Sequence, residues 1–264
     1  MKFIVDQDLH IHSHLSLCSN DAEQTKENIL KYAVNQGLKT ICLADHFWDK
    51  TAGEPSVWYS TQDYEHIAKS LPLPQTDGVR FLFGCETELD KNFRLGISAE
   101  NYNKFDFIVI PTTHLHMTEF TIPEECIGNT QKKADLWVER LACLLDMNLP
   151  FNKVGIAHLA CSLIERNEQE RIKLFNLIPQ DKMDYLFSRL AKLGVGIELN
   201  VGCMRDMLSL GQPVYRIFKS AKDNGCKFYT ATDSHHPKNF VGAKAIFERA
   251  VEVLELEEKD KFRI

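Results

Sequence analysis

The 264-residue sequence lacks the features that mark membrane and disulfide-bonded proteins. No stretch approaches the ~18 consecutive apolar residues that a membrane-spanning helix needs, and the short apolar run at residues 1–6 is no signal-peptide core. The eight cysteines are scattered and form no C-x-x-C pair, which in a chain of this length indicates reduced thiols. We therefore expect a cytoplasmic protein with no membrane partner.

The sequence also lacks an excess of basic charge. Its 31 Lys and Arg residues are outnumbered by 37 Asp and Glu residues, which gives a formal net charge of −6. Nucleic-acid binding usually needs a basic face, so we expect no nucleic-acid partner. A small phosphorylated metabolite remains compatible, because bound metal cations can dominate the local field of an acidic protein.

Length and composition are those of a single globular domain. Hydrophobic residues make up 44% and charged residues 26% of the chain, both ordinary values for a folded protein. No linker rich in Pro, Gly or Ser interrupts the chain, and α/β barrels commonly reach this length as one unit. We expect one domain over residues 1–264.

Seven apolar, strand-like runs alternate with segments of helical periodicity. This alternation predicts an α/β fold with a parallel sheet and right-handed crossovers. An open doubly wound sheet is an alternative, but a closed barrel is favoured because the polar ends of all the strands could then meet at one mouth. The predicted strands are 3–9, 38–44, 79–85, 105–111, 154–157, 195–199 and 227–232.

Histidine or acidic residues follow six of these runs. His10 and His12 lie two residues apart, and alternation along a strand puts them on the same face. These two alone are equally compatible with a polar strand edge. The repetition of the pattern favours a metal centre, whose candidate ligands are His10, His12, His46, Glu86, His114, His158, Asp233 and His235.

Eight candidate ligands exceed what one tetrahedral or octahedral ion needs. We therefore expect two or three divalent ions, with Glu86 as a bridge because a carboxylate has two oxygens to share. The mixture of imidazoles and carboxylates suits Zn, Mn or Fe better than Mg or Ca. Paired ions of this kind activate water and clamp the oxygens of an in-line displacement, which suits phosphate-ester hydrolysis best.

The motifs D-L-H-I-H-S, A-D-H, G-C-E, T-H, I-A-H and T-D-S-H, between Asp8 and His235, resemble those of the PHP (polymerase and histidinol phosphatase) superfamily. The resemblance implies a distorted seven-stranded (β/α)7 TIM-like barrel with a trinuclear metal site for phosphoesterase chemistry. Carried over by position, the ligands are His10, His12, Glu86 and Asp233 for one ion, Glu86, His114 and His158 for the second, and His46, His235 and Cys18 for the third.

Cys18 departs from the family pattern, in which this position is often His or Asp. A thiolate can bind zinc and would bias the site towards soft metals. Alternatively, Cys18 is a small loop residue and the third ion is weakly held. His14 and Asp21 are possible substitutes in the same loop.

Two further residues are candidates for catalysis. The segment 197–205 is similar to the E-x-N-T-S-G-L-R segment of histidinol-phosphate phosphatases, the closest local match, and Arg205 would clamp a phosphate oxygen there. The alternative is an exposed surface arginine. His116 could donate a proton to the leaving oxygen, or be an ordinary loop histidine. Glu88 either supports the metal ligands from behind or is simply solvated, and the solvated role is favoured.

The sequence therefore predicts metal-dependent hydrolysis of a small phosphate monoester, with histidinol phosphate as one candidate substrate. An amidohydrolase-type reaction at carbon is a rival, because the same ligands can activate water towards either electrophile. A non-catalytic metal-binding regulatory domain is the second rival.

Overall fold

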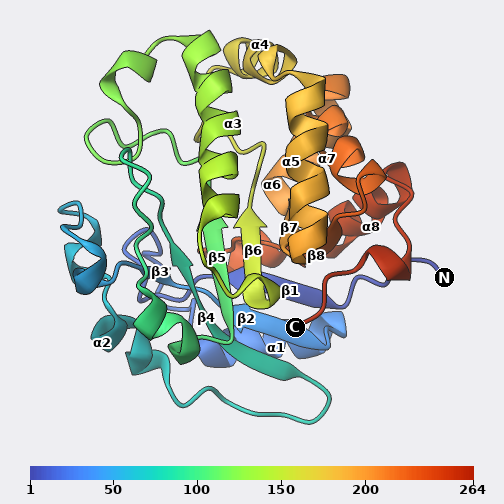
Figure 1. Cartoon of the computed structure of the whole chain (residues 1–264). Coiled ribbons are helices and arrows are strands. Elements are labelled where there is room, and N and C mark those ends of the chain that lie inside the picture. The colour runs from blue at the N-terminus through green and yellow to red at the C-terminus, as the bar shows by residue number, and fades with distance from the viewer.

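The computed structural model describes residues 1–264, and its centre is a barrel of parallel strands (Figure 1). Seven strands form the barrel in chain order, each parallel to its neighbours. They are β1 (Gln7–Ile11), β2 (Thr40–Leu43), β4 (Arg80–Thr87), β5 (Phe107–Pro111), β6 (Val154–Ala157), β7 (Gly196–Asn200) and β8 (Lys227–Ala231). A two-residue strand, β3 (His46–Phe47), pairs with the far end of β4.

The barrel nearly closes, because the first and last strands lie side by side. The backbone N–H of Asp233 donates to the carbonyl of His10 at 2.8 Å, and that of Thr232 donates to the Asp8 carboxylate at 2.9 Å. This seam between β1 and β8 confirms the predicted barrel and rules out the open sheet.

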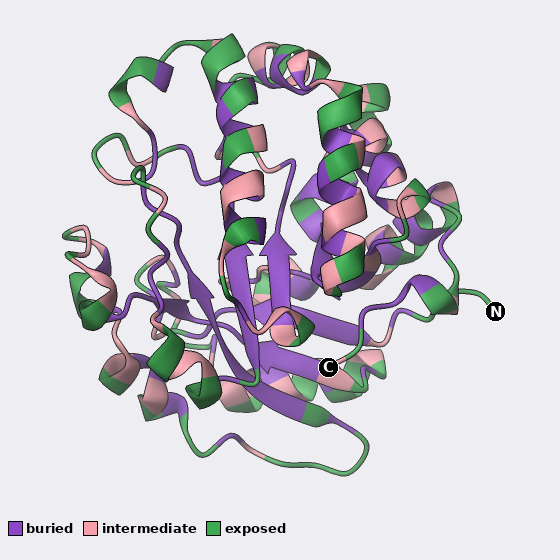
Figure 2. Ribbon diagram, viewed as in Figure 1, coloured by how far each residue is buried: buried purple, intermediate pink, exposed green.

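Helices surround the strands, which are buried, while the outward faces of the helices are exposed (Figure 2). The helices are α1 (Lys26–Gln36), α2 (Tyr64–Ile67), α3 (Thr130–Asp146), α4 (Glu168–Leu177), α5 (Gln180–Leu193), α6 (Val201–Leu210), α7 (Gln212–Asp223) and α8 (Ala243–Val253). None of them combines the length and the apolar character that crossing a membrane requires.

Some elements differ from the sequence-based expectation. The charged segment from Glu165 contains α4, whose apolar stripe is too weak to be recognised by periodicity. Helix α6 occupies most of the segment whose motif predicts phosphate binding by Arg205, and no helix is predicted there. Helix α1 begins after Thr25, whose hydroxyl caps it by accepting from Asn28 N–H at 3.2 Å.

The break between β2 and β3 places a histidine opposite an acid. β2 ends at Leu43, and when pairing resumes at β3 the register sets His46 against Glu86. The Asp45 carboxylate lies in the break and accepts hydrogen bonds at 2.7 Å from Ser13 N–H, the Ser13 hydroxyl and the Ser16 hydroxyl. It thereby holds the loop after β1 over the same end of the barrel.

The loop after β3 is fixed at its root by Asp49, which is buried. Its carboxylate accepts hydrogen bonds from Thr51 N–H (2.8 Å), the Ser98 hydroxyl (2.5 Å) and the Asn101 amide. Burial would raise the pKa of Asp49, but these hydrogen bonds outweigh it and lower the pKa from 3.8 to about 2. The ionised carboxylate therefore stabilises the fold.

Replacing Asp49 by Asn should lower the free energy of unfolding at pH 7 by about 1 to 2 kcal/mol, because the amide nitrogen cannot accept these hydrogen bonds. A carboxylate whose pKa is lower in the folded state stabilises the fold at pH values above its unfolded pKa. This stabilisation is lost as the pH falls through the folded pKa. The difference from the unmodified protein, measured by urea unfolding, should therefore shrink between about pH 4 and pH 2. The exposed Asp77→Asn is the control, and a loss independent of pH would contradict the assignment.

Candidate metal centre

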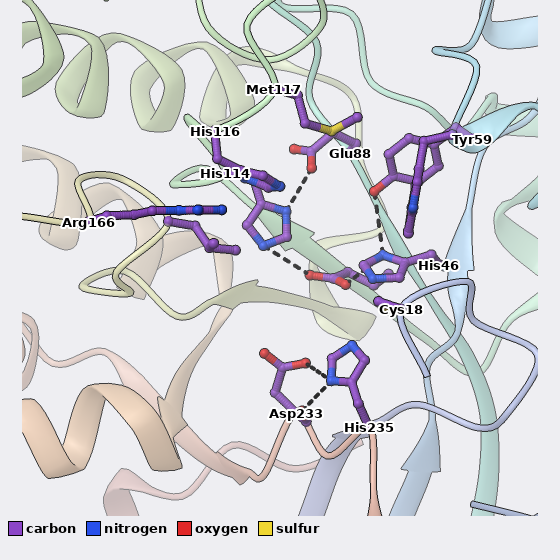
Figure 3. Close-up of a pocket in the computed structure, with 13 residues that line it drawn as sticks. Cys18, His46, Tyr59, Glu88, His114, His116, Met117, Arg166, Asp233 and His235 are labelled. Carbon is purple, nitrogen blue, oxygen red and sulfur yellow. Dashed lines mark hydrogen bonds and ion pairs between the residues drawn. The ribbon is translucent and has the colours of Figure 1, made fainter. Parts of the chain in front are cut away.

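The carboxyl ends of the strands converge on a cavity of about 460 Å³ (Figure 3). In that view Arg166 and His116 reach in from one side, Tyr59 and His46 from the other, and Asp233 and His235 lie below. The cavity is lined by Cys18, His46, Trp58, Tyr59, Glu86, Glu88, His114, His116, Met117, Leu163, Arg166, Asp233 and His235.

Glu86, at the end of β4 and only 1% exposed, occupies the centre of the histidine cluster. Its two carboxylate oxygens face different sets of imidazoles. Oε2 lies near His46 Nδ1 (2.9 Å), His12 Nε2 (3.4 Å) and His10 Nε2 (3.6 Å). Oε1 lies near His158 Nε2 (3.2 Å) and His114 Nε2 (3.9 Å). This arrangement is the one that a bridging carboxylate needs.

Asp233 and His235 complete the cluster from the end of β8. Asp233 Oδ1 lies 3.1 Å from His12 Nε2 and 3.6 Å from His10 Nε2. The His235 ring stacks on that of His12 with a centroid distance of 4.2 Å. Asp233 (φ +50°) and His158 (φ +27°) have left-handed backbone conformations. Such conformations in residues other than glycine are costly and concentrate at functional sites.

The outer nitrogens of several rings are held by protein acceptors. His10 Nδ1 donates to Glu198 Oε2 (2.9 Å), His12 Nδ1 to the Ser16 hydroxyl (2.9 Å) and His114 Nδ1 to Glu88 Oε2 (2.8 Å). Each bond places the ring proton on Nδ1 and leaves the Nε2 lone pair directed into the cluster.

The inward nitrogens fit a cation. His10 Nε2 and His12 Nε2 are only 3.0 Å apart. When both rings are neutral, with their protons on the outer nitrogens, two lone pairs face each other across this gap, and a cation between them, either a proton or a metal ion, relieves the repulsion. The donor set, imidazole with carboxylate, is the one expected for Zn, Mn or Fe.

The candidate ligands form three groups, and within each group the ligand atoms all lie within 4.8 Å of one another. They are His10, His12 and Glu86; Glu86, His114 and His158; and His12, His46 and His235. The first two match the sets that the family resemblance implied, and Asp233 joins the first through its contacts with both histidines. The third contains His12 together with His46 and His235, whereas the resemblance implied Cys18 as the partner of these two histidines.

Cys18 lines the cavity beside this third group. Burial would raise the pKa of its thiol, but interactions with His235 and His46 outweigh burial and lower the pKa to about 7. The two substitutes considered from the sequence lie elsewhere. His14 is exposed, and Asp21 pairs with His236 at 3.5 Å.

The two acids at the centre are ionised. Burial would raise the pKa of Glu86, but His46 and His10 hold it well below its usual range. Burial likewise opposes ionisation of Asp233, and His10 and His12 outweigh it, so the pKa of Asp233 is also lowered. Both carboxylates therefore offer negative charge to bound ions at neutral pH.

The structure does not bring Arg205 to the cavity. Helix α6 begins at Val201, directly after β7, with the Asn200 side chain as its cap, and Arg205 is exposed on the second turn. The arginine that lines the cavity is Arg166, from the loop after β6. No hydrogen bond or ion pair of its guanidinium is formed within the chain.

His116 lines the cavity as expected, at its exposed rim. Partial burial and the neighbouring His114 lower the pKa of its imidazole to about 4. The ring is therefore neutral near pH 7 in the absence of a further partner.

Several residues that support the centre were not assigned from the sequence. Glu88 was expected to be solvated, which is wrong. It is fully buried, binds His114, and has Arg140 Nη2 at 3.5 Å. Glu198 lies near the end of a strand, and this position is the sequence signal that marks it as a supporting residue. No sequence motif marks Arg166 as a site residue, because the residues of its loop do not predict that its side chain points into the cavity.

A parallel α/β barrel whose mouth gathers histidines around a shared carboxylate has the arrangement of a metal-binding barrel. Residues 8–202 match the PHP domain family. The chain belongs to this family, as the motifs indicated.

Among solved structures, one similar to this chain is histidinol phosphate phosphatase from Lactococcus lactis subsp. lactis Il1403, complexed with zinc, L-histidinol and phosphate. The two share 16% sequence identity and superpose with a TM-score of 0.58, over 98% of this chain and 99% of that one. At this identity the likeness establishes a shared fold. Among curated proteins, none matches the chain.

Replacing Glu198 by Gln should weaken metal binding about 10- to 100-fold, because a neutral amide with a single acceptor oxygen holds the proton on His10 Nδ1 less firmly than the carboxylate does. Competition with a chromophoric chelator for zinc measures the effect. Glu248→Gln, an exposed acid on α8, is the control. Equal zinc affinity in the two variants would show that Glu198 does not orient the ligand.

Proposed function

We propose that the protein is a metal-dependent phosphatase that hydrolyses a small-molecule phosphate monoester, with two or three divalent ions held at the barrel mouth. The observation that carries the proposal is the Glu86 carboxylate, whose two oxygens face separate histidine groups at the floor of an open cavity. The similar structure, with zinc, L-histidinol and phosphate bound, supports it. Histidinol phosphate is accordingly one candidate substrate.

Divalent ions in such a centre supply Lewis acidity for the attack of water at phosphorus. The chain's own residues hold and orient this centre. Glu198 and Glu88 fix the proton positions of His10 and His114, and Arg140 on α3 fixes Glu88 in turn. Arg140 also donates to the carbonyl oxygens of Leu89 (2.6 Å) and Thr112 (2.8 Å), and so ties together the loops after β4 and β5.

Arg166 is the residue that we assign to phosphate binding. A guanidinium presents parallel N–H groups that match two phosphate oxygens, and that of Arg166 has no partner in the chain. It would also stabilise charge that develops on the equatorial oxygens. We assign to His116, at the same rim, the transfer of a proton from solvent to the leaving oxygen.

Replacing Arg166 by Ala should lower kcat/KM for an aryl phosphate about 100-fold, because one charged donor to the phosphoryl group is lost. Arg205→Ala tests the sequence-based alternative directly and should have little effect. Phosphate release with added Mn or Zn measures both variants. A loss of activity in Arg205→Ala, with Arg166→Ala unaffected, would assign phosphate binding to Arg205 instead.

The same assay separates the rivals. Hydrolysis of amide substrates, with no effect of either arginine, would favour the reaction at carbon. Bound metal without any turnover would favour the regulatory domain.

Cys18 is proposed as a thiolate ligand of the third ion, together with His46 and His235. Its thiol lies beside both rings, and its lowered pKa of about 7 makes the thiolate accessible near neutral pH. A thiolate in this position favours zinc over manganese.

Cobalt substitution tests this ligand without reference to activity. The cobalt-loaded protein should show a near-ultraviolet thiolate-to-metal charge-transfer band, and Cys18→Ser should lose it while retaining cobalt at the other positions. Cys143→Ser, a half-buried cysteine on α3, is the control and should keep the band. A band that persists in Cys18→Ser would contradict thiolate ligation by this residue.

A further inference from the structure

The part of the cavity beyond the metal ligands is walled by apolar side chains from three loops. Trp58 and Tyr59 come from the loop after β3, Met117 from the loop after β5, and Leu163 from the loop after β6. All four line the same cavity as Arg166 and the ligand cluster, and Figure 3 shows Met117 and Tyr59 among them. The alcohol portion of a bound phosphate ester would have to occupy this space.

The aromatic wall is fixed in place. The Trp58 ring lies edge-to-face against Tyr59, with centroids 4.8 Å apart and an interplanar angle of 78°. It makes a similar contact with His46 at 4.9 Å and 81°. Because two perpendicular contacts hold it, Trp58 offers a preformed apolar surface, which lowers the entropic cost of binding a flat apolar group.

No carboxylate in the cavity is free to pair with a cationic substrate. Only three carboxylates line the cavity. Glu86 and Asp233 are committed to the histidine cluster. Glu88 accepts from His114 and from the Leu89 N–H (3.0 Å), with Arg140 beside it. A substrate ammonium group would therefore lose its hydration without gaining a counter-charge, which is costly.

Positive charge in the cavity also disfavours a cationic substrate. Arg166 has no partner within the chain, and bound divalent ions would add positive charge on the opposite wall. Both repel a cationic group and attract a dianionic phosphate.

We propose that the substrate is a phosphate monoester of an uncharged, apolar alcohol, preferably aromatic, whose ring packs against Trp58, Met117 and Leu163. The proposal rests on the proposed function for the phosphate end and adds the class of alcohol. Leu163 and the absence of a free acid beside it disfavour esters that carry an ammonium group, so among the candidate substrates histidinol phosphate should react more slowly than a neutral aromatic ester.

A matched pair of esters tests the specificity. Benzyl phosphate and 4-(aminomethyl)benzyl phosphate differ only in one ammonium-bearing arm, and kcat/KM for phosphate release should be at least about tenfold higher for the neutral ester. The corresponding benzylphosphonates, which cannot be hydrolysed at the ester position, should show the same order of Kd by calorimetry on the metal-loaded protein. Histidinol phosphate should resemble the aminomethyl ester.

Two variants at one half-buried position separate charge from shape. Leu163→Glu should raise kcat/KM for the aminomethyl ester and lower it for benzyl phosphate, because it supplies the missing counter-charge. Leu163→Gln, of the same shape and without charge, should not produce this reversal. A reversal in both variants would attribute specificity to shape and overturn the proposal.

The assays test the assigned alcohol separately from the proposed phosphatase activity. A preference of the unmodified protein for the aminomethyl ester or for histidinol phosphate would overturn the assigned alcohol and leave the phosphatase intact. Phosphonates that bind in the expected order, with no phosphate released from any ester, would support the apolar site and overturn the proposed catalysis.

Discussion

The architecture of this protein depends on the burial of one ionised carboxylate, Glu86, among imidazoles. Removing a carboxylate from water is expensive, and the cost is met only if opposite charge or good donors surround it. A single strand cannot supply them. The barrel does so because its parallel strands end at one rim, where β1, β3, β5 and β6 each direct histidines towards the end of β4. Fold and site therefore share one constraint, the meeting of strand ends.

A second set of buried side chains, behind the metal ligands, fixes how the ligand rings are oriented. Glu198 and Glu88 determine which nitrogen of their histidine partners faces inward, and both are themselves held by neighbours. The Tyr229 hydroxyl donates to Glu198 at 3.0 Å, and Asn200 donates to its other oxygen at 2.8 Å. The ligands are thus oriented by buried groups on rigid strands, which suits a centre that must hold several charges at fixed positions.

The barrel and the strand-end ligands could be predicted from the sequence, because strand–helix alternation brings polar strand ends together whatever the details of the loops. The rest depends on long-range packing. The burial of Glu88 requires Arg140, which lies 52 residues further along the chain. Arg166 replaces Arg205 at the cavity because α6 starts immediately after β7, and nothing in the local sequence excluded a loop there.

The seam between the first and last strands has a consequence for the lifetime of the protein. His10 and His12 lie on one side of it, Asp233 and His235 on the other, and the backbone bonds across it include His12 N–H to the Ser234 carbonyl at 3.0 Å. Ions shared by both sides would cross-link the two ends of the chain and add their binding free energy to barrel closure. Metal starvation would then loosen the seam first and expose the terminal strands to proteolysis.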